Sequence, residues 1–379
     1  MRLNSKLFNK FVPYHCRMTK KRLVVIFLVI MLLLVIFYSL LRPDSDRDLL
    51  KETNTKVVLS AWNGKWYRLY LSTGREEWVE LKTIFGRDCI TPVFSPDGRG
   101  ILYAEHDGND YELCYYDLTT KSSKRLTNNK FDDYSPVWSP NMKRISWGRI
   151  PKMSIKYGNM AEIYVSEWPD FFERQLTKNK RMDAYPVFVS DSNSLIIESG
   201  YVGSLFGLFR IYWDGTERPL IYEPKRSGNG LPHTYAGFVC FERASAENPN
   251  LFDIFVLQLN SGSSNSFIRL TNYRMPCNPT PRFSPDGSKI AFHRASDKGS
   301  LVAILHLNGV KKSSEVIFGQ EDEQIRLCRW NRNGTLLACE DFKRKQIVIF
   351  DKDGKSMHLG LPGSYRGQRF LEVYNFDIY

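Results

Sequence analysis

Phe94-Ser95-Pro96-Asp97-Gly98 is the stretch that decides the fold, because it returns unchanged at residues 283–287. Weaker copies, Trp-Ser-Pro-Asn at 138–141 and Phe-Val-Ser-Asp at 188–191, occupy the same place between them. A proline stands two residues before each aromatic residue, at positions 92, 136, 186 and 281, with steps of 44, 50 and 95 residues. The last step is two units long. Strand-rich repeats of about 45 residues are typical of β-propellers, in which each repeat forms one four-stranded blade.

The repeated motif also predicts where each blade begins. Proline, aspartate and glycine favour a tight turn, so the motif joins an inner strand to the next strand as a hairpin. The aromatic residue before the turn is expected to pack between blades. A proline is tolerated in this strand because an inner strand is an edge strand that lines the channel. A second marker, Arg-Leu-Thr or Gln-Leu-Thr at 125–127, 175–177 and 269–271, indicates the outermost strands.

Counting strands by this template gives seven of each kind. The segment that begins near Val57 supplies three strands without an inner one, and residues 369–378 supply an inner strand with nothing after it. Pairing of these two ends completes one blade and removes the exposed sheet edges that favour aggregation. The sequence therefore predicts an all-β, seven-bladed β-propeller closed by its N- and C-terminal strands. Six blades with irregular ends are the alternative.

From about residue 57 to the C-terminus, the Phe-Ser-Pro-Asp-Gly and Arg-Leu-Thr repeats resemble those of TolB-type propellers, a WD40-like repeat family. Similar repeats occur in the propellers of prolyl-oligopeptidase-like proteins. The resemblance implies a fold rather than an activity, because these repeats are structural. The Gly-x-Ser-x-Gly motif of the hydrolase domain in the second group is absent from the sequence.

The first 55 residues have a different character. Residues 23–41 contain no charged side chain and are long enough to cross a bilayer as a helix. Residues 1–22 carry seven lysines or arginines and no acidic residue, so the positive-inside rule places them in the cytosol. We therefore expect a cytosolic tail (1–22), a transmembrane signal anchor (23–41), a polar stalk (42–55) and a propeller domain (56–379). This single-pass, type II topology places the propeller in a lumen, the periplasm or the extracellular space.

The charge of the chain mostly reflects this topology. The net charge is +12, from 53 basic and 41 acidic residues, and seven of the basic residues belong to the tail. The remaining domain is only mildly basic, so its composition does not indicate a nucleic-acid-binding protein. Six of the seven cysteines lie in the propeller and show no metal-site spacing. Cys328 and Cys339 are expected on adjacent strands of one blade. They could form a disulfide or remain two buried thiols, and the sequence leaves both alternatives open.

No catalytic pattern stands out. The six histidines lack close metal-ligand spacing, and no phosphate-binding glycine motif is present, so we expect neither a metal nor a cofactor. His233 is the histidine expected near the central opening. Loops that lead from an outermost strand to the next inner strand gather on one face and contain recurring basic and tyrosine residues. The candidate ligand-binding residues are Arg181, Arg226, His233, Tyr273, Arg274, Tyr365 and Arg366.

Two functions remain open at this point. The first is a membrane-tethered propeller that binds a protein or an anionic glycan outside the cytosol, since converging arginines suit acidic groups. The alternative is an enzyme, a lyase or hydrolase, that acts on a polysaccharide or glycoconjugate at the channel mouth. The basic residues of these loops could also serve only to keep the protein surface soluble, without binding a ligand.

Overall fold

The computed structural model describes residues 48–379, apart from gaps at 75–77, 152–160, 191–192, 202–205, 222–227, 246, 249, 260–266, 274–278, 297, 321–322 and 363–374. The predicted cytosolic tail and the transmembrane segment 23–41 lie outside the described residues. Within the described part, no helix is long and apolar enough to cross a membrane.

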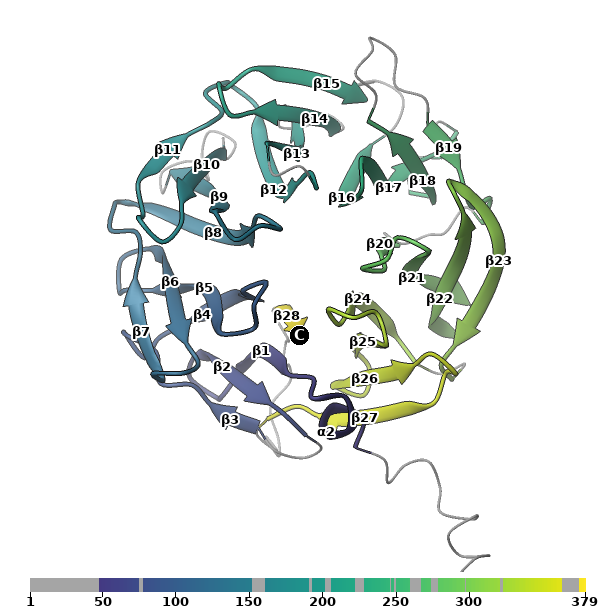
Figure 1. Ribbon diagram of the computed structural model, residues 1–379, viewed down its shortest axis with the longest axis horizontal. Coiled ribbons are helices and arrows are strands. Elements are labelled where there is room, and N and C mark those ends of the chain that lie inside the picture. Colours follow the sequence, from purple (N-terminus) through teal and green to yellow (C-terminus); the bar gives the residue numbers. More distant parts are fainter. Residues whose placement is uncertain are drawn as a thin grey trace, which may run out of the picture. The chain divides into compact units, whose positions relative to one another are not determined.

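Seven antiparallel sheets of four strands each surround a central channel (Figure 1), which confirms the predicted seven-bladed propeller. We number the blades along the chain, and blade 1 is the one that both ends of the domain share. The inner strands of blades 1 to 7 are β28 (Asn375–Ile378), β4 (Cys89–Phe94), β8 (Phe131–Trp138), β12 (Met182–Phe188), β16 (Asn229–Tyr235), β20 (Arg282–Phe283) and β24 (Ile325–Trp330).

The other strands follow the same blade order. The second strands are β1 (Val57–Trp62), β5 (Gly100–His106), β9 (Arg144–Pro151), β13 (Ser194–Gly200), β17 (Phe238–Ala244), β21 (Lys289–Ser296) and β25 (Leu336–Asp341). The third strands are β2 (Tyr67–Ser72), β6 (Tyr111–Asp117), β10 (Glu162–Glu167), β14 (Gly207–Tyr212), β18 (Phe252–Gln258), β22 (Gly299–Asn308) and β26 (Gln346–Asp351). The outermost strands are β3 (Trp78–Glu80), β7 (Ser122–Arg125), β11 (Glu173–Gln175), β15 (Glu217–Ile221), β19 (Phe267–Arg269), β23 (Lys311–Phe318) and β27 (Ser356–Gly360).

Strand β28 closes the ring by pairing with β1, as predicted from the incomplete blades at the two ends. Phe376 stands opposite Leu59 in this pair and is buried among residues of blades 1 and 7. A short helix, α2 (Leu49–Thr53), adds Leu49 and Leu50 to the same cluster. Residues 48–55, which the sequence predicted as part of a polar stalk, thus pack onto the propeller because two of their side chains are apolar and buried.

In blades 2 to 7, the residue before the repeated proline position has a positive φ. Thr91, Ser135, Tyr185, Leu231, Thr280 and Leu327 all have φ between 46° and 50°. The pairing register breaks there in five blades. A bulge leaves a residue out of the ladder, and proline has no N–H to give to it. The repeated proline therefore marks a bend of the inner strand as well as its edge position.

Candidate functional site

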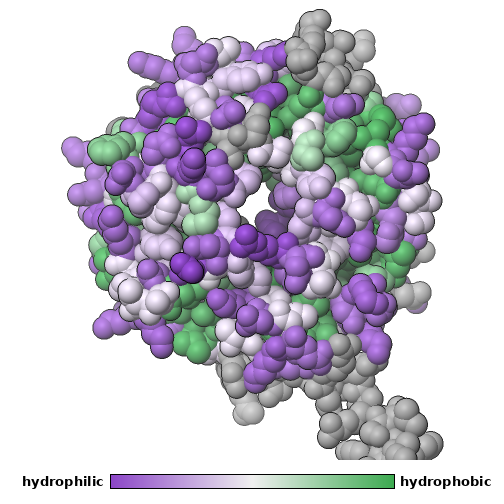
Figure 2. All heavy atoms as spheres, viewed as in Figure 1, coloured by the Kyte–Doolittle hydropathy of each residue, from purple (hydrophilic) through white to green (hydrophobic). Residues whose placement is uncertain are grey.

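The residue after the repeated proline position lies at the wall of the channel. In every blade this side chain is half-buried, follows a buried residue, and belongs to the innermost strand. Around the ring from blade 2 to blade 1, the position holds Val93, Val137, Val187, His233, Arg282, Arg329 and Asp377. One arc of the wall is therefore valine, and the other is polar and charged. Figure 2 shows the central opening bordered by hydrophilic residues.

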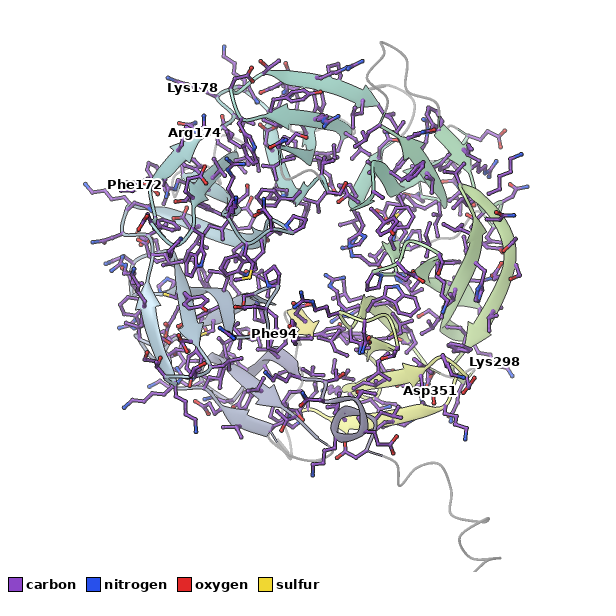
Figure 3. The ribbon with its side chains drawn as sticks, viewed as in Figure 1. Phe94, Phe172, Arg174, Lys178, Lys298 and Asp351 are labelled. Carbon is purple, nitrogen blue, oxygen red and sulfur yellow. The ribbon has the colours of Figure 1, made fainter. Side chains whose placement is uncertain are left out.

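Two polar residues of this ring contact the next blade. The main-chain N–H of Phe283 donates a hydrogen bond to Nδ1 of His233 at 3.2 Å. The N–H of Phe94 donates to Oδ2 of Asp377 at 2.9 Å, where β4 runs beside β28 (Figure 3). Burial, followed by the charges of Arg282 and Arg329, lowers the pKa of His233 well below its usual value, so its imidazole is neutral. Burial raises the pKa of Asp377 to about 6.

Two buried carboxylates stand behind the polar arc. Glu198 on β13 accepts a hydrogen bond from the N–H of Leu231, and Glu242 on β17 accepts one from the N–H of Thr280 at 3.3 Å. Burial raises the pKa of Glu198 to about 8 and that of Glu242 to about 7. Neither residue was predicted from the sequence. The available signal was an acidic residue directly after an apolar run, as in Leu-Ile-Ile-Glu at 195–198 and Val-Cys-Phe-Glu at 239–242.

Of the predicted loop residues, Arg181 and Tyr273 take part in contacts within the propeller. Arg181 pairs with Glu217 and its guanidinium stacks over Phe209. The hydroxyl of Tyr273 donates to Glu315. Of the predicted set, the structure brings only His233 to the channel wall. The others, Arg226, Arg274, Tyr365 and Arg366, lie outside the described residues.

The basic residues of these loops do not all point to the channel. Lys178 follows the outermost strand of blade 3 and lies at the outer rim of the ring (Figure 3). Its loop belongs to the predicted class, but its side chain does not contribute to the channel mouth.

An acidic cluster lies in the β5–β6 hairpin of blade 2. Carboxylate oxygens of Asp107, Asp110 and Glu112 lie within 4.8 Å of one another, which is close enough to hold a cation. The guanidinium of Arg125 already contacts two of them, at 2.9 Å from Asp107 and 2.8 Å from Glu112. An arginine side chain therefore supplies the positive charge that this cluster needs.

Cys328 and Cys339 stand directly opposite each other on β24 and β25, as the strand count suggested. Both are completely buried, and their Sγ atoms are 2.7 Å apart. The pair lies directly behind Arg329 of the channel wall.

Several exposed aromatic and aliphatic side chains of the described residues lie on one face. Because each blade is an antiparallel meander, its outermost strand ends on the face where its inner strand begins. We call this face the loop face. Ile84, Phe131, Tyr201 and Phe342 lie in its loops or at the strand ends beside them, and each is between 39% and 50% exposed.

Comparison with known proteins agrees with the fold. No family model matches the chain. It is 24% identical over 249 residues to the uncharacterized protein Atu1656 of Agrobacterium fabrum, covering 63% of this chain and 81% of that protein. It is 22% identical over 227 residues to the Tol-Pal system protein TolB of Wolinella succinogenes, covering 59% of this chain and 51% of that protein. The chain therefore spans about half the length of this TolB.

Among solved structures, an oligogalacturonate lyase in complex with manganese has a TM-score of 0.59 to this chain at 12% identity, over 83% of this chain and 87% of that one. This likeness concerns the fold alone. The class defined by the fold is the closed seven-bladed β-propeller. Within that class the chain is similar to TolB proteins, in agreement with the resemblance of its repeats.

Proposed function

We propose that the protein is a membrane-tethered propeller that binds a protein partner outside the cytosol through its loop face. The observation that carries the proposal is the row of exposed apolar side chains on that face, in the loops of several blades. Aromatic residues are enriched at the centres of protein interfaces, and large exposed apolar patches mark interaction sites. An anionic glycan remains a second kind of partner, through the predicted residues Arg226, Arg274, Tyr365 and Arg366.

The proposed compartment of the propeller is inferred from the N-terminal sequence. The charge-free segment 23–41 anchors the chain, and the basic residues 1–22 keep the N-terminus in the cytosol. This places the loop face in the lumen, the periplasm or the extracellular space. The similarity to a protein named as part of the Tol-Pal system supports a protein partner.

Crosslinking of the full chain in its own membrane tests the proposal. A variant with Phe131, Tyr201 and Phe342 replaced by serine is expected to lose the crosslinked partners of the wild type. The matched control replaces Val79 and Ile317, which are exposed on the outermost strands, by serine. Partners that persist in the first variant and disappear in the second would refute binding through the loop face. Recovery of cytosolic neighbours alone by a label at the C-terminus would refute the topology.

An enzyme that acts on a polysaccharide or glycoconjugate is the second candidate. It is favoured by the neutral His233 at the channel wall and by the two buried carboxylates with raised pKa values behind it, Glu198 and Glu242. A carboxylic acid that stays protonated near neutral pH suits general-acid work. Incubation with uronate-containing polysaccharides and analysis of chain length tests this candidate. Unchanged chain lengths, or equal cleavage by a Glu242→Gln variant, would dismiss it.

A further inference from the structure

Two arginines occupy the same position of the innermost strand in adjacent blades. Arg282 on β20 and Arg329 on β24 hold the same position after a buried residue, and both are half-buried. The Nη1 of Arg282 donates to the carbonyls of Leu231 and Pro281, at 3.3 and 3.1 Å. The Nη1 of Arg329 donates to the carbonyl of Cys328 at 3.1 Å. In the described part of the chain, neither guanidinium has a carboxylate within salt-bridge distance.

This situation differs from that of other arginines in the propeller. Arginines of comparable burial elsewhere pair with a carboxylate, as Arg125, Arg149, Arg181 and Arg326 do. A guanidinium has five N–H donors in a planar fork. Main-chain carbonyls accept from only one nitrogen of each channel arginine, so most of their donors have no protein acceptor among the described residues.

The surrounding carboxylates compensate only in part for the charges of the two arginines. Glu198 has a pKa of about 8 and is mostly protonated near neutral pH, and Glu242, at about 7, is only partly ionised. Asp377 is the carboxylate that carries most negative charge at that pH, and it already accepts from Phe94. Burial, followed by repulsion from Arg329, lowers the pKa of Arg282 to about 9, so this arginine keeps its proton. Positive charge is thus left on the wall between blades 6 and 7.

The neighbouring groups add no charge of their own. His233 is neutral, as described above. Burial raises the pKa of the Cys240 thiol, which lies behind it, to about 12, so the thiol stays protonated. Burial also lowers the pKa of Arg329, and the charge of Asp377 opposes this shift.

We propose that Arg282 and Arg329 form a binding site for a carboxylate-bearing ligand inside the channel. A guanidinium fork matches the two oxygens of a carboxylate, and hydrogen bonds between charged groups are stronger than neutral ones. A monoanion fits better than a phosphate dianion because Asp377 and the partly ionised Glu242 lie beside the site. This site is separate from the loop face and does not depend on the proposed protein partner.

The opposite wall suits the rest of such a ligand. In a ring of seven blades, blades 2 and 3 lie across the channel from blades 6 and 7 (Figure 1). Blades 2 and 3 present Val93 and Val137 at the wall position. A ligand with an acidic end and a short hydrocarbon chain would therefore place its carboxylate on the arginines and its chain toward the valines.

Calorimetric titration of the full chain in detergent, at low salt, tests the site with hexanoate as the probe. Hexanamide has the same shape without the charge, and inorganic phosphate has charge without the hydrocarbon chain. We expect hexanoate to bind, and both other compounds to bind at least roughly tenfold more weakly. This comparison uses only the wild-type protein, so it does not depend on the folding of a variant. Equal binding of hexanoate and hexanamide, stronger binding of phosphate, or no binding of hexanoate would overturn the proposal.

Variants locate the binding. Arg282→Met and Arg329→Met are each expected to weaken hexanoate binding by roughly tenfold or more, since each removes a charged donor. Arg99→Met is the control, because Arg99 is exposed on the hairpin after the repeated motif. Circular dichroism establishes that each variant is folded. Folded variants that bind hexanoate as tightly as the wild type would place the ligand elsewhere and refute the site.

The pH dependence has a fixed sign. Between about pH 8.5 and pH 6, Glu198, Glu242 and Asp377 take up protons, and Arg282, with a pKa of about 9, gains charge, so binding of an anion should strengthen as the pH falls. An affinity that weakens over this interval would contradict the assignment.

Discussion

Replacement of Phe376 by alanine is expected to weaken the closure of the ring. Phe376 is 1% exposed and packs in the cluster that joins blades 1 and 7. Truncation of a buried phenylalanine costs about 3–5 kcal/mol, because burial energy is lost and a cavity remains. Domains of this kind are stable by only about 5–15 kcal/mol, so the change removes a large part of the margin.

The matched control is Phe172→Ala. Phe172 is 76% exposed and points away from the ring at its outer edge (Figure 3). Substitution of an exposed residue of this kind changes stability by at most about 0.5 kcal/mol. Urea unfolding of both full-length variants in detergent, followed by tryptophan fluorescence, gives the two free energies of unfolding. A Phe376→Ala variant as stable as Phe172→Ala would refute closure through β28.

Deletion of residues 375–379 extends the same test. It removes Phe376 and Ile378, each worth about 1.5–3 kcal/mol when fully buried, and leaves the edge of β1 unpaired. We expect a domain that aggregates or unfolds on purification. A soluble, monomeric truncated chain with an unchanged melting temperature would show that β28 contributes nothing to the ring.

Three further predictions concern buried ionisable groups. Glu198→Gln should stabilise the protein at high pH relative to the wild type. The folded-state pKa of Glu198, about 8, lies above its unfolded-state pKa, so the wild type loses up to about 5 kcal/mol of stability as the pH rises from the unfolded-state to the folded-state value. Parallel melting curves for wild type and variant between about pH 5 and pH 9 would contradict this. Arg149→Met leaves a buried carboxylate unpaired and should cost about 3–5 kcal/mol, against at most about 1 kcal/mol for Arg144→Met in a more exposed pair, both measured by urea unfolding. Cys328 and Cys339 should be joined by a disulfide in protein isolated from its own membrane without reductant, because an oxidising compartment favours the bond. Peptide mapping that finds both thiols free would argue against an extracytoplasmic propeller.

The sequence predicted much of the fold and little of the candidate site. The motif at residues 94–98 and its copies predicted the inner strands, because tight-turn residues and a bulged proline impose local geometry wherever they occur. Of the candidate residues, His233 lies on the innermost strand of its blade, and a ligand-binding role for it stays a prediction. Arg282 and Arg329 hold the position after the repeated proline, as the valines of blades 2 to 4 do, so the repeat identifies that position. Their role as a candidate anion site depends on the lack of a carboxylate partner among the described residues, which no single stretch of sequence reveals.

By itself, the sequence determined the number of blades, the order of strands within each blade and the pairing of the two ends. These properties follow from local turn chemistry and from a repeat that must bury its apolar faces against identical neighbours. Only the tertiary structure decided which polar groups of different blades form hydrogen bonds with one another. Asp377 meets Phe94, and His233 meets Phe283, because the ring brings together residues that are far apart in the chain. The protonation of Glu198 and Glu242 is likewise a tertiary property, since it depends on how much water the folded blades exclude from each carboxylate.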